Sequence, residues 1–199
     1  PAGVQFNNGS MELVITEDPV AASNSVSNGN QMVAAKNYTC GELRTKETYL
    51  YGRLEARVRT PNSAIASGYI SSLFTYLNDP ADGFRWREID VEMEGSRPTK
   101  FQRNLIFGEE TWRWNETRAW GAYEEVIEIG STSEWRDYAI EWTQTEILWY
   151  VDGVLESTLT MNEVSQFGAT IPELASKIMM NFWIPNDQIQ NAFGGNKVD

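Results

Sequence analysis

The sequence predicts an all-β protein, an antiparallel β-sandwich, and three observations support this. Short segments that alternate apolar and polar residues follow one another along the chain, each bounded by turn residues. The 3.6-residue periodicity of an amphipathic helix is nearly absent. The 199 residues suffice for one hydrophobic core, so we expect a single domain that spans residues 1–199.

The first half of the chain contains three ordinary predicted strands. Residues 10–16 form the first, and a loop of small polar residues follows at 21–31. In residues 51–60 charged residues alternate with apolar or small ones, as in a strand with one buried face. Residues 68–76 are apolar or small on both faces, which is typical of a central strand.

The second half of the chain continues the pattern. Asp152 and Gly153 supply the positive φ angles of a tight hairpin turn. A long loop is predicted at 108–123, and a short helical turn at 172–175. The remaining predicted strands are 101–107, 136–142, 146–150 and 176–183.

The predicted strand at residues 86–95 is unusual. Ile89, Val91 and Met93 occupy one face, as in a strand that packs on a core. The other face carries Trp86, Glu88, Asp90, Glu92 and Glu94. Like charges in a row destabilise a strand, in which Asp and Glu are already disfavoured. Folding alone does not explain this row, so it indicates a function.

Composition narrows the chemistry. The net charge of −12 argues against nucleic acid, anionic membranes and polyanionic substrates, and it favours a neutral substrate. The absence of histidine excludes Ser-His and Cys-His catalysis and histidine-ligated zinc, which leaves proton transfer mostly to carboxylates. The 8 Trp, 8 Tyr and 8 Phe suggest rings on a surface that binds something flat, such as sugar rings.

The single cysteine and three short motifs bear on the cellular compartment. Cys40 excludes a disulfide within this chain, and it is either a buried inert thiol or the partner of a cysteine outside these residues. Asn8, Asn37 and Asn115 each begin an N-glycosylation motif, which favours a secreted glycoprotein. No apolar run approaches the length of a membrane span.

Glu88 and Glu92 have the spacing for general acid and nucleophilic chemistry. Their Cα atoms are about 13 Å apart along a strand, and long side chains can close much of that gap toward the ~5.5 Å between the carboxyls of a retaining glycosidase. Asp90 between them disfavours ionisation of all three carboxyls at once. Two other interpretations remain open, a calcium site and a solvated face neutralised by Arg44, Arg87 and Arg103.

Residues 86–95, WREIDVEMEG, resemble the E-x-D-x-E signature of glycoside hydrolase family 16, most closely that of its lichenases, the endo-β-1,3-1,4-glucanases. Further segments resemble the lichenases in the same order, namely 40–45 with 51–52, 71–76, 138–142, 149–154 and 177–183. The resemblance implies a β-jelly-roll sandwich of two antiparallel sheets with a concave substrate cleft.

The same resemblance implies roles for individual residues. Glu88 would be the nucleophile, Glu92 the general acid/base and Asp90 a supporting carboxylate. The family pattern assigns Glu94 no role, and we expect it at the rim of the cleft. The substrate-binding side chains would be Trp86, Phe74, Tyr76, Glu42, Arg44, Gln102, Asn104, Asn181 and Trp183. By composition alone such rings are more often core than ligand platforms, and Trp112, Trp114 and Trp120 gain no support from the resemblance.

The chain also departs from the family pattern. Ile106 stands where lichenases carry a cleft tyrosine, so the substrate preference stays open. The family's N-terminal segment and closing C-terminal strand have no counterpart, which favours a portion of a longer protein with some terminal strands lacking. The partner of Cys40 and part of a structural calcium site would lie in the absent segment.

These observations lead to one main functional hypothesis and two alternatives. The main hypothesis is a retaining endo-glycosidase that hydrolyses β-glucan, with mixed β-1,3-1,4 or β-1,3 linkages, through a covalent glycosyl-enzyme. A transglycosylase on cell-wall glucan would use the same residues, and a non-catalytic glucan-binding module would typically lack the paired glutamates. We expect a secreted monomer that requires no cofactor and binds neither nucleic acid nor membranes.

Overall fold

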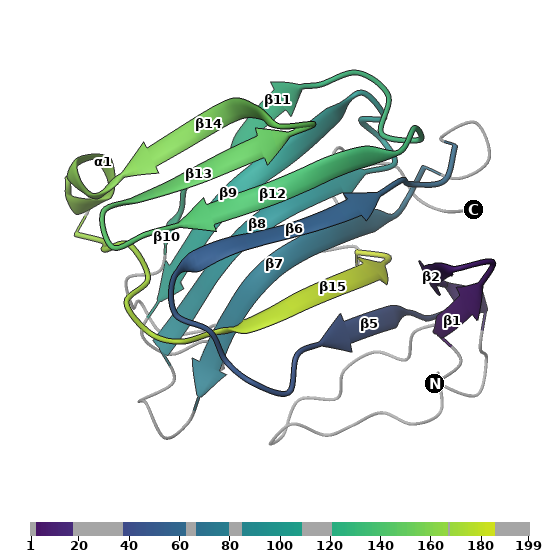
Figure 1. Cartoon of the computed structure of the whole chain (residues 1–199), viewed down its shortest axis with the longest axis horizontal. Coiled ribbons are helices and arrows are strands. Elements are labelled where there is room, and N and C mark those ends of the chain that lie inside the picture. Colours follow the sequence, from purple (N-terminus) through teal and green to yellow (C-terminus); the bar gives the residue numbers. More distant parts are fainter. Residues whose placement is uncertain are drawn as a thin grey trace.

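The computed structural model describes residues 3–17, 38–62, 67–79, 85–108, 121–166 and 168–185. In these residues two main antiparallel sheets lie face to face (Figure 1). The smaller sheet covers part of the larger one, on the side opposite the acidic row of residues 86–94. The prediction of an all-β sandwich of two antiparallel sheets is confirmed.

The larger sheet has the strand order β10-β9-β8-β7-β15-β5, and β11 also pairs with β9. Its members are β5 (Gly41–Arg44), β7 (Ile70–Asp79), β8 (Arg85–Glu94), β9 (Lys100–Gly108), β10 (Gly121–Ala122), β11 (Glu125–Glu128) and β15 (Lys177–Trp183). The strand that carries the acidic row is β8, which is paired on both sides. Its backbone is therefore held firmly by two ladders of hydrogen bonds.

The smaller sheet has the order β14-β13-β12-β6. Its strands are β6 (Gly52–Val58), β12 (Arg136–Trp142), β13 (Glu146–Val151) and β14 (Val154–Thr160). Asp152 and Gly153 join β13 to β14 with φ angles of 51° and 79°, which confirms the predicted hairpin turn. Two short pairs complete the description, β1 (Val4–Asn7) with β2 (Ser10–Leu13), and β3 (Thr16–Glu17) with β4 (Tyr38–Thr39).

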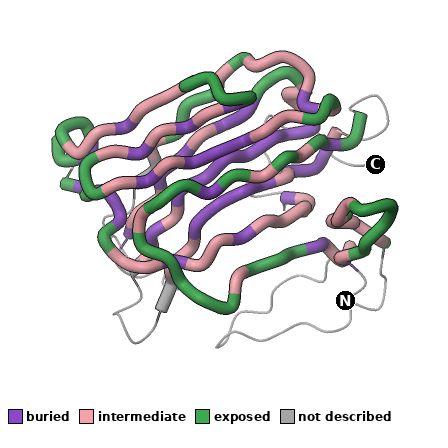
Figure 2. Tube along the Cα trace, in the orientation of Figure 1, coloured by how far each residue is buried: buried purple, intermediate pink, exposed green. Residues whose placement is uncertain are grey.

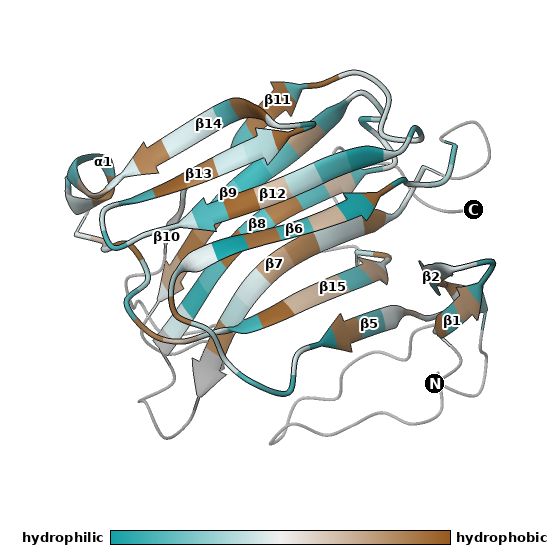
Figure 3. Ribbon diagram, viewed as in Figure 1, coloured by the Kyte–Doolittle hydropathy of each residue, from teal (hydrophilic) through white to brown (hydrophobic). Residues whose placement is uncertain are grey.

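The hydrophobic core lies between the two main sheets. Ile89 and Val91 of β8 are 0% exposed, as are Ile140 and Trp149 of the smaller sheet. Figure 2 shows buried residues along the middle of the strands, and Figure 3 shows apolar and polar residues alternating along them. Each fully buried large side chain contributes about 1.5–3 kcal/mol to folding. Packing of the odd-numbered residues of β8 in this core turns the even-numbered ones to the outer face.

The predicted helical turn at 172–175 is wrong. The structure instead has α1 (Met161–Ser165), which begins with a capping box between Thr160 and Glu163. Tertiary contacts hold this irregular segment, because the carbonyl of Pro172 accepts the indole N–H of Trp142 at 3.0 Å. Ser176 then pairs with Tyr49 in an isolated β-bridge.

Several predicted features lie outside the described residues. They are the loop at 21–31, the motifs at Asn37 and Asn115, and Trp112, Trp114 and Trp120. The third motif, at Asn8, lies in the exposed turn between β1 and β2. Cys40 is half-buried and its thiol is free. Within the described ranges no helix is long and apolar enough to cross a membrane.

Candidate active site

The acidic row lies on the outer face of the larger sheet, where it forms the centre of three rows of side chains across the strands. The register places Glu88 between Tyr76 and Ile106, Asp90 between Phe74 and Asn104, and Glu92 between Ser72 and Gln102. The first row continues to Lys177, the second to Met179 and Arg44, and the third to Asn181 and Glu42. Strand pairing therefore gathers into one surface residues that are far apart in the sequence.

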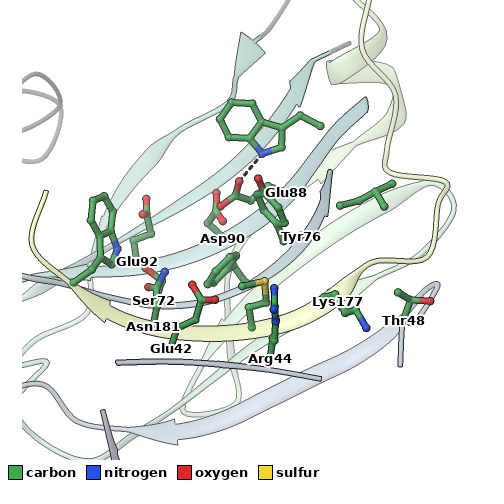
Figure 4. A pocket seen from close by; sticks show the side chains of 15 residues that line it. Glu42, Arg44, Thr48, Ser72, Tyr76, Glu88, Asp90, Glu92, Lys177 and Asn181 are labelled. Atoms are coloured by element: carbon green, nitrogen blue, oxygen red, sulfur yellow. Dashed lines mark hydrogen bonds between the residues drawn. The ribbon is translucent and has the colours of Figure 1, made fainter. Parts of the chain in front are cut away.

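A hollow of about 680 Å³ opens over these rows (Figure 4). Its predicted lining residues are Glu42, Arg44, Phe74, Tyr76, Trp86, Glu88, Asp90, Glu92, Asn181 and Trp183. The other two predicted residues, Gln102 and Asn104, do not line it. They are buried on β9 beside Glu92 and Asp90. A hollow of this size is typical of sites that bind small molecules or sugar units.

Five residues that sequence reasoning missed also line the hollow, namely Thr48, Ser72, Leu77, Lys177 and Met179. A usable signal existed for three of them. Ser72 shares the strand face of Phe74, and Lys177 and Met179 share that of Asn181. Thr48 and Leu77 carry no such signal in the sequence.

Glu88 is half-buried and held by its neighbours. The indole N–H of Trp86 donates to Glu88 Oε2 at 2.6 Å, the bond drawn as a dashed line in Figure 4. Burial raises the pKa of Glu88 to about 7, and hydrogen bonds from Trp86 and Asp90 limit that rise. Glu88 thus lies in a site that disfavours its negative charge.

Asp90 is 3% exposed, and its ionisation is disfavoured. Burial, followed by the charges of Glu88 and Glu92, raises the pKa of Asp90 well above its ordinary value. The protonated side chain hydrogen-bonds to Glu88. In the described part of the chain Asp90 Oδ2 and Asn181 Oδ1 are buried without a hydrogen-bond partner. Both oxygens are therefore buried acceptors that this structure leaves unsatisfied.

Glu92 also lies where its negative charge is disfavoured. Burial and the charges of Glu88 and Glu94 raise the pKa of Glu92 to about 8, while a hydrogen bond from Gln102 opposes the rise. That bond joins Gln102 Nε2 to Glu92 Oε2 at 3.3 Å. Near neutral pH the cluster therefore keeps part of its protons, and it can combine one ionised carboxyl with one protonated carboxyl. This combination supplies a nucleophile and an acid on one strand face.

Glu94 shares the strand face of Glu92 but not the hollow. It does not line the hollow and is 3% exposed, so it is buried instead of lying at an open rim. Its Oε1 is 3.3 Å from Arg97 Nη1, and the Ser96 hydroxyl donates to its Oε2 at 3.3 Å. Glu94 thus acts on the site through its charge, which raises the pKa of Glu92.

Neither alternative interpretation of the acidic strand gains support from the described residues. No group of three or more carboxylate or cysteine side chains in these residues could hold a metal ion. Arg87 and Arg103 occupy the opposite face of the larger sheet from the carboxylates, and only Arg44 lines the hollow. Asp90 and Glu92 are 3% and 9% exposed, so the row is not a solvated surface.

The raised pKa values predict a pH-dependent stability. Burial favours the protonated carboxyls of Glu88 and Glu92 in the folded state, so this stabilisation is complete below their unfolded pKa of about 4.5. It is lost as the pH rises through about 7 and about 8. We expect the Tm of Glu92→Gln, measured by calorimetry, to exceed that of the wild type increasingly from pH 5 to pH 9. A constant Tm difference over that range would contradict the assignment.

Comparison with known proteins agrees with this geometry. Residues 7–199 match the profile of glycosyl hydrolases family 16. The chain is 36% identical over 152 residues to a β-glucanase of Bacillus subtilis (strain 168), an alignment that covers 75% of this chain and 54% of that protein. A β-glucanase of Paenibacillus polymyxa is also 36% identical, with 75% and 55% covered. The chain thus spans about half the length of the curated relatives it matches.

Solved structures lead to the same family. The β-glucanase of Bacillus licheniformis matches with a TM-score of 0.70 and 30% identity, over 100% of this chain and 77% of that chain. A β-1,3-1,4-glucanase (lichenase) derived from a mouse hindgut metagenome matches with a TM-score of 0.70 and 25% identity, over 98% and 78%. With its acidic strand at the centre of the outer sheet face, the chain belongs to glycosyl hydrolase family 16.

Proposed function

We propose that this chain carries the active site of a retaining endo-glycosidase that hydrolyses β-glucan, with mixed β-1,3-1,4 or β-1,3 linkages. One observation carries the proposal. Glu88 and Glu92 lie on one face of β8 at the base of a hollow, where burial raises the pKa of both carboxyls, so that one can be ionised while the other keeps its proton. Membership of a family whose curated relatives are named β-glucanases supports the substrate class.

The reaction follows from these two protonation states. Glu88 attacks the anomeric carbon while Glu92 donates its proton to the departing glycosidic oxygen, which forms a covalent glycosyl-enzyme. Glu92, now a carboxylate, takes a proton from water, and the water oxygen attacks the same carbon and displaces Glu88. The bond from Trp86 holds Oε2 of Glu88 in place at the hollow.

The lining of the hollow suits a neutral polysaccharide. Trp86, Tyr76 and Trp183 place rings at the hollow, where they can stack on glucosyl units. Phe74 is 5% exposed, and it packs edge to face on Tyr76 with ring centroids 6.4 Å apart, so it supports that ring from below. Glu42, Arg44 and Asn181 supply polar groups for sugar hydroxyls. From β9, Gln102 donates to Glu92, and Asn104 pairs with Asp90.

The remaining expectations belong to the same proposal. The mechanism uses side chains alone and requires no cofactor. A polysaccharide substrate favours a secreted enzyme. The exposed Asn8 motif offers a site for glycosylation in a eukaryotic secretory pathway. We propose a monomer, because the hollow is formed by strands of one chain.

The test is an incubation with mixed-linkage β-glucan, laminarin, xyloglucan and agarose, followed by NMR of the first products. We expect oligosaccharides from mixed-linkage glucan or laminarin, released initially as the β-anomer. An initial α-anomer would overturn retention, and cleavage of agarose alone would overturn the glucan assignment. Products longer than the substrate would indicate transfer to a second sugar instead of hydrolysis.

A further inference from the structure

Trp149 of β13 contacts the backbone of the acidic strand from the opposite sheet. Its indole N–H donates to the carbonyl oxygen of Asp90 at 2.9 Å. Trp149 is 0% exposed, so water does not replace this bond. The carbonyl belongs to the peptide that joins Asp90 to Val91, midway between Glu88 and Glu92. The smaller sheet therefore touches the acidic strand at the centre of the carboxyl row.

Arg103 contacts the Trp149 ring, and two further polar residues hold Arg103. The guanidinium carbon of Arg103 lies 5.2 Å from the ring centroid. Arg103 Nη2 and Nε donate to Glu125 Oε2 at 2.9 and 3.0 Å, and Nε also reaches Ser157 Oγ at 3.1 Å. The Ser157 hydroxyl donates to the same Glu125 oxygen at 2.7 Å. We call Trp149, Arg103, Glu125 and Ser157 the Trp149 brace.

The brace brings together four strands at the level of the carboxyl row. Ser157 pairs with Trp149, and the strand register shifts immediately afterwards, between Trp149 and Tyr150. Such irregularities redirect side chains near functional sites. Arg103 pairs with Val91, the residue on the other side of the peptide that Trp149 contacts. The Trp149 brace thus meets the Asp90–Val91 peptide twice, through the hydrogen bond of Trp149 to the Asp90 carbonyl and through the strand pairing of Arg103 with Val91.

A second buried tryptophan makes the same kind of hydrogen bond away from the acidic strand. Trp142 of β12 is 3% exposed, and its indole N–H donates to the carbonyl of Pro172 at 3.0 Å. That carbonyl lies in the connection before β15. The two tryptophans therefore make the same kind of bond at similar burial, and only Trp149 bonds to the acidic strand.

We propose that Trp149 is a positioning residue for hydrolysis, which holds the Asp90–Val91 peptide so that the carboxyls of Glu88 and Glu92 keep the spacing that the reaction requires. This inference rests on the proposed function. Small displacements of reacting groups are costly, since an error of about 1 Å can lower the rate by ~10²-fold. A donor fixed by a buried network prevents such displacements.

The test compares Trp149→Phe with Trp142→Phe, each of which keeps a ring and loses one N–H donor. We expect both variants to lose similar stability in urea unfolding, since each loses one buried hydrogen bond. In Trp149→Phe kcat on the preferred glucan should fall about tenfold with KM nearly unchanged, because the ground-state contacts remain. In Trp142→Phe both constants should stay near wild type.

A substitution at an exposed residue tests the same proposal without changing the core. The Glu125 side chain is 49% exposed, so Glu125→Gln should fold normally while it removes the charged partner of Arg103. We expect kcat to fall in the same direction as in Trp149→Phe, by a smaller factor. Equal kcat values in wild type, Trp149→Phe and Glu125→Gln would overturn the proposal.

A second readout does not depend on activity. Carboxyl ¹³C NMR should show Glu88 and Glu92 titrating at lower pH in Trp149→Phe, since a looser strand admits water to carboxyls whose pKa burial raises. Trp142→Phe should titrate as the wild type. If the wild type cleaves no glucan, the proposed function fails, but this titration still tests whether Trp149 positions the acidic strand. Identical titrations of Glu88 and Glu92 in both variants would overturn the positioning role of Trp149.

Discussion

Replacement of Glu88 by glutamine is expected to lower kcat on β-glucan by on the order of 10⁵-fold, the loss typical when a nucleophile is removed. The amide has no charge and cannot attack the anomeric carbon, but its oxygen still accepts the indole N–H of Trp86. Glucan binding should persist, because the lining of the hollow is unchanged. Initial rates of reducing-sugar release and isothermal titration with an oligosaccharide measure the two effects.

The chain offers a matched control on the same strand face. Glu94→Gln removes a second buried carboxylate but leaves the lining of the hollow intact. We expect this variant to keep kcat within about tenfold of wild type, since only the charge that Glu92 senses is lost. A Glu88→Gln enzyme that retains more than a few per cent of wild-type activity would contradict the role of Glu88 as the nucleophile.

Replacement of Glu92 by glutamine is expected to lower kcat on glucan by about 10³-fold, within the range for loss of a general acid. With an aryl glycoside the first step should be nearly unaffected, because a good leaving group departs without a proton. Hydrolysis of the glycosyl-enzyme should then become slow, since water has lost its general base. Mass spectrometry of the reaction mixture should detect a protein heavier by one glycosyl unit.

The pH dependence provides an independent check on Glu92. In the wild type kcat/KM should fall below pH ~7 as Glu88 is protonated, and above pH ~8 as Glu92 loses its proton. Glu92→Gln should lack the fall at alkaline pH on the aryl substrate. Equal losses on glucan and aryl glycoside, with an unchanged pH profile, would contradict a general acid/base at this position.

Local patterns in the sequence were sufficient for the acidic strand. The alternation in residues 86–95 depends only on the two-residue period of a strand, so it predicted both the core face at Ile89 and Val91 and the opposite carboxyl face. The hairpin at Asp152 and Gly153 was equally local, since the turn depends on two φ angles. The family also followed from ordered segments of the sequence alone.

Features that depend on contacts between distant segments escaped sequence reasoning. The segment at 172–175 is not helical, because Pro172 and Ser176 bond to residues far away in the chain. The contributions of Thr48 and Leu77 to the hollow became visible only after the strands were paired.

By itself, then, the sequence determined which residues could carry out the chemistry, because side-chain identity and strand periodicity are local properties. The tertiary structure decided how those residues behave. Pairing of β8 on both sides buried the carboxyls, and this burial raises the pKa values of Glu88 and Glu92. Packing of the second sheet brought Trp149 to the carbonyl of Asp90, a contact between residues 59 positions apart. Burial and such long-range contacts arise from the whole fold, so no local pattern encodes them.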